Sequence, residues 1–258
     1  MSLPGRVVVV TGGTQGVGRG IALSFLRDGA RVLVCARKPP AQPIAFAENT
    51  AAFEVLNVRQ PEDIERVVET IKTRYGRLDV WVNNAGGAPP KAAAEASPRF
   101  TASIIELNLT AALVCSQKAN ALMQQQPEGG SIIQIASVSA LRPSPGTSAY
   151  GAAKAGLISA TQSLAVEWAP KVRVNAVTPG MVHTELSALH YGSEQGIAAA
   201  AATVPLGRLA TPSDVGEACV FLASPLASYI SGANIILHGG GEAPAFLGAV
   251  AAADSGKG

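Results

Sequence analysis

Short apolar runs rich in Val, Ile and Leu recur along the 258-residue chain, and segments with helical spacing separate most of them. Strands that alternate with helices in this way predict a parallel sheet covered on both faces. We therefore expect a doubly wound α/β fold of the Rossmann type, with a seven-stranded, mostly parallel sheet. The strands are expected at residues 5–11, 31–36, 52–56, 79–83, 131–136, 172–177 and 234–237, and the helices from Val17 onward and at 61–75, 98–123, 148–168 and 212–223.

The interval between the second and third expected strands departs from this alternation. It contains Pro39, Pro40 and Pro43 within nine residues. Proline removes a backbone donor and disfavours helix in the residue before it. We expect a loop here instead of a crossover helix.

The composition limits the class of protein. Hydrophobic residues make up 48% and charged residues 15%, which suits one sheet-and-helix core, and we expect a single catalytic domain over residues 1–258. The net charge is +2, and no basic cluster is longer than Arg37-Lys38, so no nucleic-acid partner is indicated. Neither a signal peptide nor a membrane span is expected. Cys35, Cys115 and Cys219 lie in apolar runs, which predicts buried thiols and fits a cytoplasmic protein.

A glycine-rich turn joins the first expected strand to the first helix, with the sequence TGGTQGVG over residues 11–18. Glycines let the backbone approach a pyrophosphate, and the amino end of a helix favours negative charge. A lone glycine-rich turn is weak evidence, but its position at the first strand–helix junction of such a chain predicts a dinucleotide site. The residues expected to contact the cofactor here are Gly12, Thr14, Gln15, Gly16, Val17 and Gly18.

The end of the second strand determines which cofactor is expected. An acidic residue there would bind the ribose 2′-hydroxyl, whereas a basic residue would pair with a 2′-phosphate. This chain has Arg37 and Lys38, and the guanidinium fork of Arg37 suits a phosphate. NADP(H) is therefore favoured. The alternative is that Arg37 is a solvated strand-end charge that stacks on adenine, which would leave NAD(H) usable.

Tyr150 and Lys154 are four residues apart on one expected helix, and hence on the same face. Reduction of a carbonyl leaves negative charge on its oxygen, which needs a proton donor within reach. The phenol of a free Tyr has a pKa of about 10, and a nearby ammonium stabilises the phenolate. Tyr150 is therefore the expected general acid, with its pKa lowered by Lys154.

The glycine-rich turn also resembles the TGxxxGxG pattern of short-chain dehydrogenases/reductases. The resemblance extends over nearly the whole chain, through the Asn-Asn-Ala-Gly sequence at 83–86, Asn108, Ser137, the Tyr150-x-x-x-Lys154 pair and Pro179-Gly180. Ser137, rather than Ser139, has the thirteen-residue spacing to the tyrosine that the family shows.

The resemblance implies roles for these residues. Asn108, Ser137, Tyr150 and Lys154 would form the catalytic set, in which Ser137 orients substrate, Asn108 anchors a proton-relay water and Lys154 also binds the nicotinamide ribose. Asn57 and Val58 would border adenine, although Asn57 replaces the usual Asp, which predicts weakened recognition. The other implied cofactor contacts are Asn84, Ala85 and Gly86 near the adenosine ribose, Pro179 and Gly180, and Val182 and Thr184 near the nicotinamide amide or phosphate.

The activity implied is hydride transfer between NADP(H) and a small carbonyl or secondary alcohol, such as a ketone or 3-oxoacyl thioester. An NAD-dependent alcohol dehydrogenase and a non-catalytic dinucleotide-sensing protein are the alternatives, and the intact catalytic set argues against the second. A substrate lid is implied at residues 181–205 and is mostly apolar. No metal is expected, since the three histidines, His183, His190 and His238, have no ligand spacing.

The family also implies a homotetramer, built from helices 98–123 and 148–168 and from residues 218–237. A tail at residues 242–258 follows the last expected strand, with Phe246, Leu247 and Val250 at helical spacing. Two interpretations of the tail remain open: a solvated extension, or a segment that docks on a neighbouring subunit beside its lid.

Overall fold

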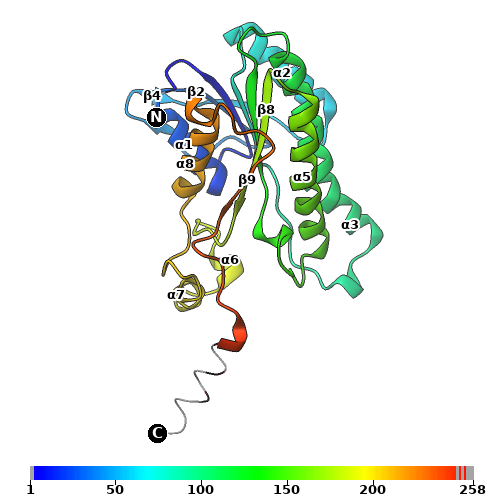
Figure 1. Ribbon diagram of the computed structural model, residues 1–258, viewed down its shortest axis with the longest axis vertical. Coiled ribbons are helices and arrows are strands. Elements are labelled where there is room, and N and C mark those ends of the chain that lie inside the picture. The colour runs from blue at the N-terminus through cyan, green and yellow to red at the C-terminus, as the bar shows by residue number, and fades with distance from the viewer. Residues whose placement is uncertain (1–2, 248–249, 251–252, 254–258) are drawn as a thin grey trace.

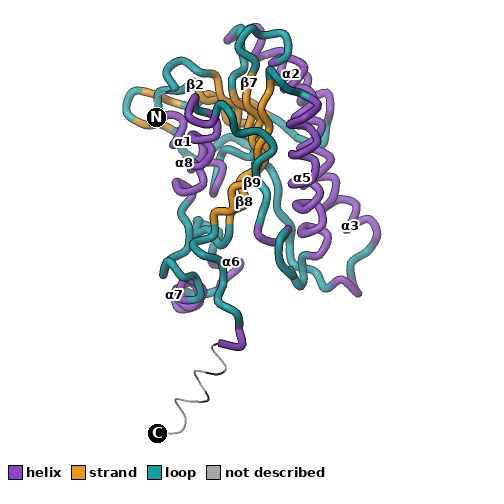
Figure 2. Tube along the Cα trace, in the orientation of Figure 1, coloured by secondary structure: helices purple, strands orange, loops and turns teal. Residues whose placement is uncertain are grey.

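The computed structural model describes residues 3–247, 250 and 253. Its main sheet has seven strands in the order β5-β2-β1-β6-β7-β8-β9, and every neighbouring pair is parallel. The doubly wound α/β prediction is thereby confirmed (Figures 1 and 2). The strands are β1 Val7–Thr11, β2 Arg31–Ala36, β5 Ala52–Val55, β6 Val80–Asn83, β7 Gly130–Ile135, β8 Val172–Pro179 and β9 Asn234–Leu237.

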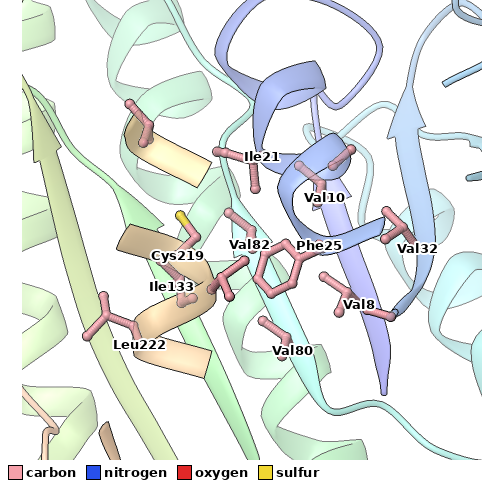
Figure 3. Packing of buried hydrophobic residues seen from close by; sticks show 14 of the residues in the cluster. Val8, Val10, Ile21, Phe25, Val32, Val80, Val82, Ile133, Cys219 and Leu222 are labelled. Atoms are coloured by element: carbon pink, nitrogen blue, oxygen red, sulfur yellow. The ribbon is translucent and has the colours of Figure 1, made fainter. Parts of the chain in front are cut away.

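Helices cover both faces of this sheet (Figure 1). On one face, α1 (Gly16–Arg27) and α8 (Pro212–Ala223) pack side by side. Figure 3 shows Phe25 of α1 among the valines of β1 and β6, and Cys219 of α8 beside Ile133 of β7. The other face carries α2 (Pro61–Tyr75), α4 (Ala111–Met123) and α5 (Ser148–Glu167). All three cysteines are buried and free, as predicted.

The helix expected at 98–123 is interrupted once. It consists of α3 (Pro98–Ile105), one π-helical turn at Glu106–Thr110, and α4. The run Pro98–Met123 is long and apolar enough to cross a membrane by length and composition. Its buried residues pack on the sheet, with Cys115, Ala119 and Met123 in the core, so this property is weak evidence for a membrane span.

The proline-rich interval forms no helix, as the prolines predict. A two-stranded antiparallel ribbon of β3 (Ala45–Phe46) and β4 (Asn49–Thr50) follows them. Ala47 in its turn has a positive φ of 50°. The ribbon was not predicted, because two-residue strands leave no alternating pattern to detect.

The lid predicted at residues 181–205 contains α6 (Ala188–Tyr191) and α7 (Glu194–Ala202). In the tail beyond it, Phe246 and Leu247 are exposed, and so is Val250. The rest of the tail prediction, at residues 248–249, 251–252 and 254–258, lies outside the described residues.

The strand order reverses direction between β1 and β6. From β1 the chain moves outward through β2 to β5, and it then returns to β6 on the opposite side of β1. In open α/β sheets, ligands bind in the crevice at the carboxyl ends of the strands at such a switch point. The glycine-rich turn follows β1 here, and residues 84–86 follow β6, so the fold brings these two motifs together.

Candidate active site

Thr11 and Asn84 tie the two motifs at the switch point to each other. The Thr11 hydroxyl accepts hydrogen bonds from the backbone N–H groups of Asn84 and Ala85, each at 3.0 Å. The Asn84 amide nitrogen donates to the carbonyls of Thr11 at 3.0 Å and Gly12 at 3.1 Å. Asn84 therefore holds the glycine-rich turn in place through its side chain. Its predicted contact with the adenosine ribose would be a second role.

The glycine-rich turn requires glycine for steric and conformational reasons. Gly12 and Gly16 have φ values of 63° and 53°, a region that favours glycine. A Cβ atom on Gly18 would overlap the Gly12 carbonyl oxygen. At these glycines the backbone carries no Cβ atom where the turn meets α1, which fits the predicted pyrophosphate contact along residues 12–18.

The residues expected at the adenine end lie at the carboxyl ends of β2 and β5. Arg37 and Lys38 are exposed, and across the described residues neither forms a hydrogen bond or ion pair. The Asn57 side-chain oxygen accepts a hydrogen bond from Arg59 N–H at 3.2 Å, which leaves one lone pair for adenine. Val58 is partly buried against the core.

Lys154 is almost fully buried in α5, with 4% of its surface exposed. Its ammonium donates to the carbonyl oxygen of Ile135, the last residue of β7, at 2.7 Å. It also lies 5.7 Å from the centre of the Tyr150 ring. Burial lowers the pKa of Lys154 to about 8, because the charged form is desolvated.

Tyr150 is half-buried one turn before Lys154 and shares a hydrogen bond with the Ser137 side chain. Burial raises the pKa of Tyr150, and the bond with Ser137 opposes that rise. The expectation that Lys154 lowers this pKa is not what the structure shows. Desolvation dominates at the phenol, while the Lys154 ammonium is directed to the Ile135 carbonyl.

Asn108 occupies the π-helical turn and is 1% exposed. Its side-chain oxygen accepts from Gly87 N–H at 2.8 Å, and its amide nitrogen donates to the carbonyls of Gly87 and Ile104, both at 2.9 Å. A Cβ atom on Gly86 would lie 2.6 Å from the Asn108 oxygen and 3.5 Å from the Lys154 ammonium. Because Gly86 has no side chain, the backbone after β6 can lie directly against two of the predicted catalytic residues, Asn108 and Lys154.

The segment after β8 reaches the glycine-rich turn from the other side. Gly180 N–H donates to the Leu237 carbonyl, and Val182 forms a bridge with Ala210. The Thr184 methyl group lies 3.9 Å from the position that a Cβ atom on Gly16 would take. Of the predicted contacts from Pro179 to Thr184, Thr184 thus lies beside the glycine-rich turn.

Known proteins match this chain over nearly all of its length. A family model described as enoyl-(acyl carrier protein) reductase matches residues 12–242. An uncharacterized short-chain type dehydrogenase/reductase of Sinorhizobium fredii is 37% identical over 243 residues, which are 92% of this chain and 44% of that protein. The 3-oxoacyl-(acyl-carrier-protein) reductase of Vibrio cholerae is 35% identical over 243 residues, covering 93% of this chain and 98% of the relative.

The protein belongs to the short-chain dehydrogenase/reductase family. The ligand-free structure of Thermoplasma acidophilum aldohexose dehydrogenase agrees, with a TM-score of 0.85 and 31% identity over 92% of this chain and 94% of that one. Membership makes the protein an oxidoreductase of this type, and the family uses nicotinamide cofactors.

A hollow of about 300 Å³ adjoins Tyr150 in this short-chain dehydrogenase/reductase. Its described lining comes from residues 88–104 and 146–152 and not from the lid. Ala88, Pro89, Phe100 and Ile104 make one wall mostly apolar, and the volume is near the lower end of ligand pockets in general.

Metal-ligating side chains do not gather here. Within the described ranges, no three residues among His, Cys, Asp and Glu stand close enough to hold a metal ion. His183 is exposed, and His238 lies against Gly180 and Gly241.

Three groups at this site of the short-chain dehydrogenase/reductase are not among the residues predicted from the sequence: the Thr11 hydroxyl, the Ile135 carbonyl and the Glu185 carboxylate. A Thr at a strand end directly before two glycines is a signal that could have identified the first. The Ile135 carbonyl carries no residue-specific signal, because every residue has one. Glu185 accepts from Gly16 N–H at 2.7 Å across 169 residues of sequence, which only the folded chain reveals.

Proposed function

We propose that this short-chain dehydrogenase/reductase catalyses hydride transfer between NADP(H) and the carbonyl or alcohol carbon of a small substrate. The observation that carries the proposal is the buried Lys154 ammonium beside Tyr150, which in turn bonds Ser137. When bound, the nicotinamide would supply or accept the hydride. The chain's own residues then have to manage one proton and one developing charge.

Tyr150 is the proposed proton donor in carbonyl reduction and the acceptor in alcohol oxidation. The Ser137 oxygen accepts a hydrogen bond from Ser139 N–H at 3.2 Å, so its own proton is available to Tyr150 or to a substrate oxygen. Lys154 is held as an ammonium below about pH 8 and places positive charge near the phenol. Its proposed second role is to bind the nicotinamide ribose.

Asn108 is proposed to position the backbone next to these groups. Both of its amide protons are donated to main-chain carbonyls, and one of its oxygen lone pairs is occupied by Gly87 N–H. One lone pair remains for the relay water that the family role requires. A π-helical turn at this residue agrees with the frequent occurrence of such turns at functional sites.

The proposed cofactor preference depends on Arg37. Its guanidinium is exposed at the end of β2, where a 2′-phosphate would lie, and no carboxylate occupies that position in the sequence. NAD(H) would be preferred if Arg37 only stacked on adenine. The proposed contacts to the rest of the cofactor are those given above for residues 12–18, 57–58, 84–86 and 179–184.

The proposed substrate is a ketone or 3-oxoacyl thioester whose apolar part enters the hollow beside Tyr150. Its lining includes one charged residue among those described, Lys91, which is paired with Glu95 at 2.7 Å. An apolar wall with a paired charge favours an uncharged substrate segment. The proposed setting is cytoplasmic, as a single catalytic domain.

The proposed assembly is a homotetramer. A second hollow lies between α4 and α5, lined by residues that include Leu113 and Leu164. Beyond α8, Leu226 is 71% exposed and Tyr229 is fully exposed, and both lie in the segment expected to form a subunit contact. Light scattering should give about four times the 26.2 kDa chain mass, and a monomer mass would refute the proposal.

Direct titration with both reduced cofactors, followed by a carbonyl substrate panel, tests the proposed function. Tighter binding of NADPH than NADH, and cofactor oxidation that depends on a ketone or 3-oxoacyl thioester, are expected. Tighter binding of NADH would instead favour the NAD-dependent alcohol dehydrogenase. Binding without turnover of any carbonyl or alcohol would favour a dinucleotide sensor.

A further inference from the structure

The amino end of α1 already holds a carboxylate. Glu185 is exposed in the segment between β8 and α6, and its side-chain oxygen accepts a hydrogen bond from Gly16 N–H at 2.7 Å. Gly16 is the first residue of α1. The contact joins the lid segment to the turn proposed to bind the cofactor pyrophosphate.

Helix α1 provides no acid or cap of its own at this end. Gln15 precedes it without a side-chain capping bond, and its first turn contains no acidic residue. The first backbone N–H groups of a helix lack partners within the helix, and the helix dipole favours an anion beside them. Glu185 supplies that anion from a distant part of the sequence.

Glu185 is held there by a tight turn. Thr184 N–H donates to the Ser187 hydroxyl at 2.8 Å, and Ser187 N–H donates back to the Thr184 carbonyl at 3.0 Å. Ser187 is 2% exposed and directly precedes α6. The turn therefore fixes the backbone at Glu185, and the carboxylate contact links the amino end of α1 to the segment that begins the lid.

We propose that Glu185 is an internal, displaceable anion at the phosphate-binding turn, which the cofactor must push aside in order to bind. This inference rests on the proposed function, since it takes residues 12–18 as the pyrophosphate site. A carboxylate and a pyrophosphate repel each other and compete for the same N–H group. Displacement of Glu185 couples cofactor binding to rearrangement of the lid.

Titration of four full-length proteins with NADPH, NADH and inorganic pyrophosphate tests the inference. Glu185→Gln removes the charge, Glu185→Ala removes the contact as well, and Glu194→Gln is the control, because it neutralises an exposed lid acid at the start of α7. Both Glu185 variants should bind the preferred dinucleotide about threefold to tenfold more tightly than wild type. Inorganic pyrophosphate should compete more strongly in them, whereas Glu194→Gln should match wild type.

Unchanged or weaker dinucleotide binding in both Glu185 variants would overturn the inference and leave the proposed function intact. If none of the four proteins bound a dinucleotide, the proposed function itself would fail. A role of Glu185 confined to stability would not produce tighter binding.

Limited proteolysis without cofactor tests the coupling to the lid. Leu186 and Leu189 are exposed chymotrypsin sites next to Glu185. Loss of the contact in Glu185→Ala should speed cleavage at residues 186–191 relative to wild type and Glu194→Gln. Equal cleavage rates in all three would show that the contact does not restrain the lid.

Discussion

The two ends of the proposed cofactor site are constructed differently. At the chemical end, Lys154 and Asn108 are buried and donate to main-chain carbonyls that fix their positions. At the adenine end, Arg37 and Lys38 are exposed beyond β2 and, among the described residues, unpaired. We infer that the proposed proton transfer would depend on desolvated groups in fixed positions, whereas the proposed cofactor choice would depend on a surface charge. Substitutions at the first end should alter activity and stability, and those at the second should alter preference alone.

Tyr150→Phe should have the largest effect. Loss of the general acid should lower turnover by at least about a hundredfold while the dissociation constant of the cofactor stays within about twofold. Steady-state kinetics and cofactor titration measure the two quantities. Tyr75→Phe is the control, since Tyr75 is the last residue of α2 and belongs to none of the proposed sites. Retained activity in Tyr150→Phe would contradict the assigned mechanism.

Lys154→Met should change the pH dependence of stability as well as activity. Burial lowers the pKa of Lys154 to about 8 from the ordinary 10.5, so between these pH values the unfolded chain binds more protons than the folded chain. The cost of the buried charge is therefore present at neutral pH and is lost as the pH rises. From pH 7.5 to 10.5 the free energy of unfolding of wild type should rise relative to the variant by about 3 kcal/mol.

Urea denaturation across this pH range measures that change, and Lys72→Met, at an exposed position of α2, is the matched control. Cofactor binding and turnover should both weaken in Lys154→Met, because the ammonium has two proposed partners. If Lys154→Met impaired only cofactor binding or only turnover, the dual role would be ruled out. If the free energy of unfolding varied with pH in the same way in wild type and Lys154→Met, a buried ammonium at this position would be ruled out.

Arg37→Asp should shift cofactor preference from NADP(H) toward NAD(H) by about 1–3 kcal/mol, the scale of a charge-assisted hydrogen bond. The ratio of the two dissociation constants measures the shift, and thermal stability should be unchanged. Arg31→Asp makes the same charge change at the opposite end of β2 and should leave the ratio as in wild type. An equal shift in both variants would indicate a general field effect instead of a phosphate contact.

Ser137→Ala should have the smallest effect of the four substitutions, and this effect is a shift in the pKa of Tyr150. The bond with Ser137 lowers the pKa of Tyr150 against the rise caused by burial, so its loss should move that pKa upward. Tyr150 must lose its proton to act as the base in alcohol oxidation, so the limb of the kcat/KM profile on which activity rises with pH should shift to higher pH. Ser139→Ala keeps the backbone N–H that bonds Ser137 and serves as control. An unshifted profile would show that the limb does not report on Tyr150.

Much of the site could be predicted because its signals are local. Glycines at 12, 16 and 18 have steric or conformational roles that a sequence pattern records, and Tyr150 and Lys154 share one helix face by their spacing. The Tyr150 pKa could not be predicted correctly. Its direction depends on how much water the fold removes and on where the Lys154 ammonium points.

The sequence alone determined the alternation of apolar runs and amphipathic helices, and with it the parallel sheet, because side-chain periodicity is a property of the chain itself. It also placed the proposed catalytic residues on their strands and helices. The tertiary structure decided what each group meets: the Ile135 carbonyl at Lys154, Gly86 against Asn108, and Glu185 at the amino end of α1. These contacts join segments far apart in sequence, and their partners are mostly backbone atoms, which carry no residue-specific signal.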